Sequence, residues 1–119
     1  MGLRIMVKIC HAGKCINTSA LLNTGFETPE PMVSLPIELA EKLELNIESS
    51  IEFEGPGLTR GSSYLGDKVK ITVSTGKEQR EVLAEALITP GEDEVVLSDK
   101  CIEALGIVID LRNKKWWFS

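Results

Sequence analysis

The stretch Ala20-Leu21-Leu22-Asn23-Thr24-Gly25-Phe26 decides how the chain is interpreted. An apolar run ends in the small polar triplet Asn23-Thr24-Gly25, and an aromatic residue follows. This pattern indicates a buried strand that leads into a polar turn. Because a strand fixes the position of the loop that follows it, such loops often carry active-site side chains. An ordinary turn at the end of a strand is the alternative.

The length and composition are those of one ordinary globular domain. The chain has 119 residues, of which 43% are hydrophobic and 26% charged, and we treat residues 1–119 as a single domain. The formal net charge of −5 is spread over mixed acidic and basic residues, which argues against a nucleic-acid partner. The sequence shows no bilayer-spanning apolar stretch and no signal-peptide layout, so we expect no membrane partner and a cytoplasmic location.

The three cysteines are Cys10, Cys15 and Cys101. Free buried thiols are the usual state in a chain without a secretory signal. Cys10 and Cys15 flank a short turn, so a disulfide across a hairpin, as hyperthermophile cytosols permit, is the alternative. Cys10, His11 and Cys15 do not match the usual zinc spacings, and we expect no metal and no cofactor. His11, the only histidine, is expected as an exposed turn residue rather than a general base.

The N-terminal part of the chain predicts a hairpin, a loop and a short helix. Residues 3–9 and 15–22 are rich in branched apolar residues and predict paired strands. Two prolines keep the start of segment 27–35 in a loop, and its end predicts a short extended piece. Pro36 begins a predicted helix over 37–43, where its missing N–H costs nothing.

A glycine-rich segment lies in the middle of the chain. Three glycines occur within residues 55–61, between predicted strands at 51–53 and 69–73. Glycine density at a hairpin tip gives the mobility of a flap or lid, and a plain exposed turn is the alternative. No Gly-Lys-Ser/Thr ending or helix start follows, which argues against a phosphate-binding loop.

The C-terminal part predicts further strands and a second helix. The expected strands cover residues 80–87, 94–97, 107–111 and 115–118. Because alternation is weak in the first of them, a helix over 80–86 is the alternative. Ser98 or Asp99 can cap a helix over 100–105, which ends at Gly106.

Three aromatic residues, Trp116, Trp117 and Phe118, stand together near the end of the sequence. Chain ends are normally frayed and polar, so these side chains need a reason to be there. Packing on the chain's own core and burial in a subunit interface are the two explanations.

Two blocks of sequence occur in a recognisable order. The first is LLNTGF at 21–26, followed by VSLPIELAEKL at 33–43. The second is VVLSD at 95–99, followed by LGIVID at 105–110. Together they resemble the retropepsin-like aspartic proteases in their small microbial form, which carry Asp-Thr-Gly, a Leu-Pro helix, a glycine-containing flap and a second apolar loop. The resemblance extends roughly from Ile5 to the last residue.

The resemblance implies a mostly-β fold, a retroviral-protease-like closed β-barrel with one or two short α-helices. It also implies a homodimer in which each subunit lends one aspartate to a single site that cleaves a peptide or protein substrate. Two carboxylates about 3 Å apart share a proton and titrate as a pair. One acts as base toward water, and the other as acid toward the peptide carbonyl.

Residue by residue, the resemblance assigns the catalytic position to Asn23, the bracing hydroxyl to Thr24 and the close backbone approach to Gly25. It assigns substrate binding to Phe26, Glu27, Gly55, Gly57 and Leu58. The flap corresponds to residues 53–65, and the C-terminal strand of a dimer sheet corresponds to residues 116–118.

Two positions depart from the family pattern. Ser98 stands where the second loop normally has glycine, a change that a small residue tolerates. Asn23 occupies the position of the catalytic aspartate. An amide keeps the shape and hydrogen bonds of a carboxyl group, but it cannot take a proton from water near neutral pH.

The chain as written should therefore be inactive as an aspartic endopeptidase, and the sequence leaves three explanations open. Asn23 is an engineered inactivating substitution, or a natural replacement in a pseudoprotease that serves as a peptide-binding or assembly module. The third explanation is that the chain is a different small β domain.

Overall fold

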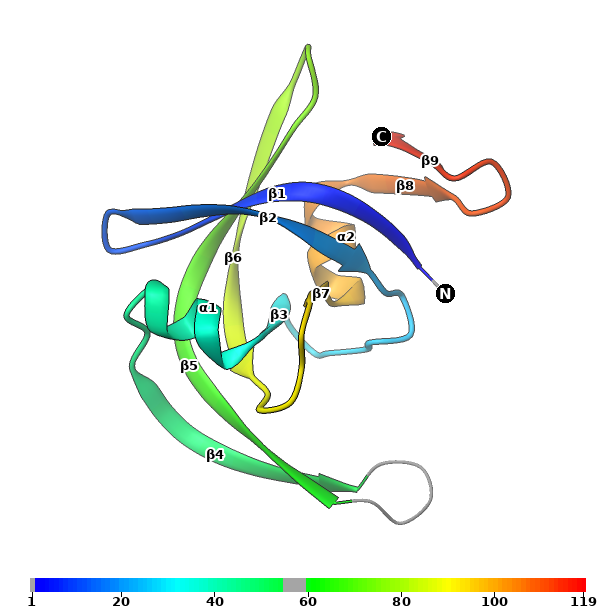
Figure 1. Cartoon of the computed structure of the whole chain (residues 1–119). Helices are drawn as coiled ribbons and strands as arrows, with labels where there is room; N and C mark the ends of the chain where they lie inside the picture. Colours follow the sequence, from blue (N-terminus) through cyan, green and yellow to red (C-terminus); the bar gives the residue numbers. More distant parts are fainter. Residues whose placement is uncertain (1, 55–59) are drawn as a thin grey trace.

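The computed structural model describes residues 2–54 and 60–119 (Figure 1). The strands are β1 (Leu3–His11), β2 (Lys14–Leu22), β3 (Met32–Leu35), β4 (Ile47–Glu54), β5 (Arg60–Ser74), β6 (Gln79–Ile88), β7 (Val95–Leu97), β8 (Ile107–Asp110) and β9 (Lys115–Phe118). The helices in the described ranges are α1 (Ile37–Lys42) and α2 (Asp99–Leu105). Neither of them has the length and apolar character needed to cross a membrane. The chain is mostly β with two short helices, as predicted.

The strands close into a barrel. The pairing runs β1-β2-β7-β3-β6-β5, and β5 then returns to β1 through pairs such as Ile9↔Ile71. β2 and β7 are parallel, as are β3 and β6, and the other neighbours in the ring are antiparallel. β4 pairs with β5 outside the ring, so the β4–β5 hairpin projects from the barrel (Figure 1). The predicted closed barrel is confirmed.

Alternating side chains from the barrel strands form the core. Ile5, Val7 and Ile9 of β1 are buried while their neighbours Arg4, Met6 and Lys8 are exposed. A strand that is buried on one face alternates in this way because successive side chains point to opposite sides. α2 adds three buried side chains to the core, namely Cys101, Ile102 and Leu105.

Two strands differ from the sequence-based expectation. β6 covers residues 79–88, so the alternative of a helix over 80–86 is wrong. This segment forms a strand despite its weak alternation, because it pairs antiparallel with β5 and parallel with β3. β5 is 15 residues long, whereas the alternating pattern predicted only residues 69–73. The extra length comes from its N-terminal part, which pairs with β4 in the projecting hairpin.

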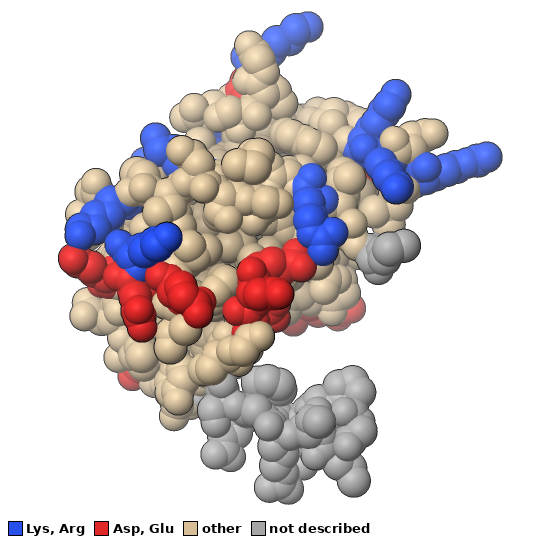
Figure 2. Space-filling view, in the orientation of Figure 1, with Lys and Arg blue, Asp and Glu red and all other residues tan. Residues whose placement is uncertain are grey.

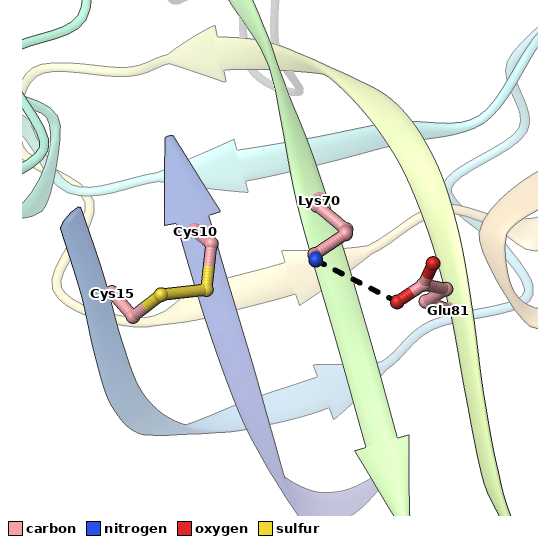
Figure 3. The surroundings of a disulfide bond; sticks show 4 residues. All are labelled: Cys10, Cys15, Lys70 and Glu81. Carbon is pink, nitrogen blue, oxygen red and sulfur yellow. Dashed lines mark ion pairs between the residues drawn. A yellow bond between two sulfur atoms is a disulfide. The ribbon is translucent and has the colours of Figure 1, made fainter. Parts of the chain in front are cut away.

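A disulfide joins Cys10 and Cys15 near the tip of the β1–β2 hairpin (Figure 3). The expectation of free thiols is therefore wrong for these two residues, and only Cys101 is free and buried. Cys10 and Cys15 are directly opposite in the strand register, with their Cα atoms 4.1 Å apart, so the hairpin itself brings them together. The bond also removes them as metal ligands.

His11 is not the exposed turn residue that the sequence suggested. The tight turn is made by Ala12 and Gly13, both of which have positive φ, and His11 belongs to the end of β1. Two-residue turns of this kind match the twist of the flanking strands. The His11 side chain is only 17% exposed, because it packs toward the end of α1 and toward Asp67 of β5.

The aromatic residues near the C-terminus divide between two environments. Trp116 and Phe118 pack against the core and meet edge to face, with ring centroids 5.4 Å apart. Arg80 lies over the Phe118 ring and donates hydrogen bonds to the carbonyl oxygens of Leu105 and Ser119. Packing on the core therefore explains Trp116 and Phe118, whereas Trp117 remains 47% exposed.

Candidate active site

Two polar turns lie side by side at the ends of parallel strands β2 and β7. Leu22 and Leu97 are paired in register, and the next backbone N–H, that of Asn23, donates to the Leu97 carbonyl oxygen at 3.3 Å. Parallel strands end at the same edge of a sheet, so the turns after them begin at the same level. The structure thus brings together the two blocks that the sequence separates by about 70 residues.

The first turn is closed by the Asn23 side chain. Its Oδ1 accepts the Gly25 N–H at 2.9 Å, and the Phe26 N–H donates to the Asn23 carbonyl oxygen at 3.1 Å. A Cβ at position 25 would lie only 3.2 Å from this Oδ1, so glycine allows the close approach. The amide oxygen accepts this backbone N–H, which leaves the amide nitrogen of the exposed side chain as a hydrogen-bond donor.

The second turn is closed by Ser98, which is fully buried. Its Oγ accepts the N–H of Cys101 at 3.3 Å, as a helix N-cap, and the N–H of Met32 at 3.0 Å. Of the two predicted caps, Ser98 is the one that acts. Ser98, at the position where the resemblance leads one to expect glycine, therefore connects α2 to β3.

Asp99 ties the two turns to each other. Its N–H donates to the Phe26 carbonyl oxygen at 2.9 Å, and its Oδ1 accepts the Thr28 N–H at 3.0 Å. The segment that follows the polar triplet is thus held from both ends. Sequence analysis considered Asp99 only as a helix cap, because the partners are 71 residues apart along the chain.

A small hollow opens in front of the first turn. It has a volume of about 180 Å³ and is lined by Gly2, Leu22, Asn23, Thr24, Ile109 and Leu111. The triplet 23–25 is exposed to this side, and Leu111 is 58% exposed. A Cβ at Gly2 would lie 2.5 Å from the Leu22 carbonyl oxygen, so the N-terminal segment packs tightly beside the turn. The hollow has an apolar flank and a polar floor.

The other site residues from the sequence are only partly brought together. Phe26 is half-buried through its place between the two turns, and Glu27 is exposed. Gly55, Gly57 and Leu58 lie outside the described residues, as does the tip of the segment assigned as a flap. The described stem of that segment, in β4 and β5, is an antiparallel hairpin.

The chemistry open to this arrangement follows from its side chains. The described residues that line the hollow include no carboxylate, and the nearby Asp99 carboxylate accepts the N–H groups of Thr28 and Lys100. Asn23 offers a hydrogen-bond donor and an acceptor but cannot act as a base near neutral pH. Among the described residues there is no group of three or more His, Cys, Asp or Glu side chains that could hold a metal ion.

Cys101 lies behind the second turn and has a structural role. Burial raises the pKa of its thiol, which opposes formation of the thiolate. The thiol donates to the Met32 carbonyl oxygen at 3.1 Å. Cys101 therefore adds a second link between α2 and β3, next to the hydroxyl of Ser98.

The surface charge is mixed on the face in Figure 2. Basic and acidic side chains form neighbouring groups there, with no continuous basic surface over that face. Ion pairs at the surface of the molecule include Arg4–Glu94 and Lys14–Glu44. Such pairs stabilise a folded chain only slightly.

The closed barrel, the two short helices and the projecting hairpin define the class of fold, which is that of the retroviral proteases. Among solved structures, the EIAV protease in complex with the inhibitor HBY-793 has a TM-score of 0.67 with this chain. The match covers 93% of this chain and 94% of that chain, at 17% sequence identity. No protein-family model matches the sequence, and no curated protein matches it significantly. The predicted fold is confirmed, and an unrelated β architecture is wrong.

A cluster of contacts at the base of the β4–β5 hairpin was not predicted from the sequence. Asp67 binds His11 and Asn46 there, and neither residue was singled out together with it. The contacts join positions 21 and 56 residues apart, which no local pattern encodes. The single histidine next to a tight turn was the one available signal.

Proposed function

We propose that the chain is a retropepsin-like aspartic endopeptidase scaffold that works as a homodimer and is inactive as written because Asn23 replaces the catalytic aspartate. The observation that carries the proposal is the first turn. The side-chain oxygen of Asn23 accepts the Gly25 N–H, and the second turn holds the segment that follows. An aspartate at position 23 would keep this hydrogen bond and present its other oxygen to the hollow.

The paired-carboxylate mechanism explains why one position per chain suffices. Two aspartates at position 23, one from each subunit, cannot both ionise at close range, so they hold one proton between them. The ionised group takes a proton from water, and the protonated group donates to the peptide carbonyl. Thr24 braces the two turns across the dimer axis, while Phe26, Glu27 and the β4–β5 hairpin contact the peptide.

Exposed apolar side chains support the dimer. Leu111 and Trp117, 58% and 47% exposed, belong to the β8–β9 hairpin and its turn, and Leu111 also lines the hollow in front of Asn23. Aromatic and apolar residues of this kind are enriched in the cores of subunit interfaces. A second copy that covers this face would place its own first turn near the first.

The test is the substitution Asn23→Asp. We expect cleavage of a peptide library with an acidic optimum, blocked by transition-state mimics, and no cleavage by the native chain or by the Asn23→Ala control. Removal of the base in a catalytic unit usually costs at least about 10⁴-fold in rate, so the contrast should be unambiguous. A folded, dimeric Asn23→Asp protein that cleaves no peptide would contradict the proposal.

A pseudoprotease that only binds peptides is the second candidate, and Asn23 itself favours it. The Asn23 amide nitrogen can donate to a peptide carbonyl, whereas a carboxylate pair would repel that carbonyl oxygen. This function predicts that the native chain binds library peptides and that Asn23→Asp weakens binding without any hydrolysis. Equilibrium binding of fluorescent peptides to both forms separates the two candidates.

The cytoplasmic location stays a prediction. A disulfide between Cys10 and Cys15 in that compartment requires the oxidising cytosol found in hyperthermophiles. Thiol quantification after rapid acid quenching of cells that contain the protein would test whether Cys10 and Cys15 are oxidised there.

A further inference from the structure

One side chain, His11, connects the tip of the β1–β2 hairpin to the base of the projecting β4–β5 hairpin. We call residues 46–48 and 65–68 the hairpin root. The pairing register shifts there on both sides, between Ile47 and Ser49 against β5 and between Leu65 and Lys68 against β6. Such irregularities bend a strand, so the root is where the hairpin turns away from the barrel.

Asn46 and Asp67 fasten the two strands of the root together. The Asp67 Oδ2 accepts the backbone N–H of Asn46 at 2.9 Å and its side-chain amide at 3.2 Å. The Asp67 N–H donates to the Asn46 carbonyl oxygen at 3.2 Å. Both Asn46 groups can only donate, so this carboxylate oxygen acts as an acceptor.

His11 faces an acceptor on each of its ring nitrogens. Its Nε2 lies 3.1 Å from the same Asp67 Oδ2, and its Nδ1 lies 2.9 Å from the Leu43 carbonyl oxygen at the end of α1. A neutral imidazole has one N–H, whereas the imidazolium has two. The imidazolium alone satisfies both contacts, and with side chains 17% and 22% exposed, water replaces a lost bond poorly.

The charged groups around His11 come from four elements. Besides Asp67 of β5, Glu44 follows α1 and pairs at 2.8 Å with Lys14 of β2. The Lys14 ammonium lowers the Glu44 pKa, and the charge of His11 lowers it further. Lys68 and Lys70 line a hollow of about 270 Å³ together with His11, and Lys70 lies 3.7 Å from Glu81 of β6 (Figure 3).

We propose that His11 is a pH-sensitive clasp on the hairpin root. The imidazolium holds Asp67 and the end of α1 at once, whereas a neutral ring keeps only one of these contacts and loosens the β4–β5 hairpin. The clasp rests on the proposed function in one respect, which is that the β4–β5 hairpin would cover the peptide bound at the two Asn23 turns. Acid would then fix the root of the cover under the conditions in which an aspartate pair works.

Nuclear magnetic resonance of the native chain tests the clasp directly, because His11 is the only histidine. Between about pH 5.5 and about pH 8, the interval in which histidine side chains in general change charge, two ring N–H signals should accompany the closed clasp and one the loosened state. Over the same interval, amide exchange protection at Asn46 and Asp67, corrected for the intrinsic rate, should fall about tenfold. Protection at Ala84 in the barrel should stay unchanged.

Two variants separate the clasp from a general effect of charge. His11→Gln should lower protection at the root at about pH 5.5 and abolish its pH dependence. Lys14→Gln changes the same hairpin tip, breaks only the exposed pair with Glu44, and should keep the pH dependence. A neutral ring at about pH 5.5 in the native chain, or pH dependence that survives in His11→Gln, would overturn the proposal. No substrate is used, so failure of the protease proposal leaves this result unaffected.

Discussion

The turns after β2 and β7 use the same local chemistry in opposite environments. Asn23 and Ser98 each follow a buried strand, and each side chain accepts a backbone N–H a few residues on. Ser98 is fully buried and accepts a second N–H from β3, whereas Asn23 is exposed beside a hollow. The turn at Ser98, which we call the closed turn, therefore stabilises the fold. The turn at Asn23, which we call the open turn, is accessible to a ligand.

Removal of each side chain gives the largest contrast. Ser98→Ala should lower the free energy of unfolding by about 2–3 kcal/mol, since two buried N–H groups lose their acceptor. Asn23→Ala should cost about 0.5–1 kcal/mol, because water replaces the acceptor of the exposed Gly25 N–H. Urea unfolding measures both. Equal losses would show that the two turns do not differ in this way.

Leu111 tests whether the open turn is covered by a second chain. If the hollow lies at the dimer interface, Leu111→Glu should weaken self-association by roughly tenfold or more, because it places a charge in a buried contact. Leu83→Glu is the matched control, because Leu83 is 63% exposed on β6 and should leave association unchanged. Sedimentation velocity over a dilution series gives both values. A similar loss in both variants would point to general solubility rather than to an interface.

The free thiol of Cys101 reports on the closed turn. Its burial and raised pKa predict slow alkylation by iodoacetamide at mildly alkaline pH. Ser98→Ala should accelerate the reaction by about tenfold through more frequent local opening, and Asn23→Ala should not change it. Mass spectrometry follows the modification, since Cys10 and Cys15 are protected as a disulfide. Fast alkylation of the native chain would be incompatible with this packing.

Acid should affect the flank of the open turn slightly. Hydrogen bonds from Asn113 lower the pKa of Asp110, which ends β8 next to Leu111. A lowered pKa contributes stability above the ordinary value of 3.8 and loses it as the pH falls through the folded value. The native chain should therefore melt slightly above Asp110→Asn at neutral pH and together with it in strong acid. The Ser98 hydroxyl does not titrate, so a larger acid effect would place the weak point elsewhere.

The sequence predicted the fold where local pattern and pairing agree. The branched apolar runs of β1 and β2, the Pro36 start of α1 and the Gly106 end of α2 each carry a local signal. The burial of β6 alternates along the strand, but its sequence hides this because the apolar Leu83 is 63% exposed whereas the charged Arg80 is half-buried. Its pairing with β3 and β5 is a long-range effect that no window along the chain contains.

The candidate site was predicted less completely. The triplet 23–25 and Ser98 were identified from the sequence, but their connection through Asp99 depends on folding the chain back over about 70 residues. His11 was misplaced because the turn proved to be two residues long, which moves His11 into β1 and against Asp67. The sequence did not decide between free thiols and a disulfide at Cys10 and Cys15, because the bond depends on the strand register that places them opposite each other.

The central claim is that two copies of the Asn23 turn form one site, and a subunit-mixing experiment tests it most directly. Asn23→Asp chains are mixed with increasing amounts of native chain, allowed to exchange subunits, and assayed for peptide cleavage. If each site needs an aspartate from both chains, the fraction of active dimers follows the square of the Asn23→Asp fraction, so the activity of a fixed amount of Asn23→Asp chain drops to about half when an equal amount of native chain is added. Activity that stays proportional to the amount of Asn23→Asp chain would contradict a shared site.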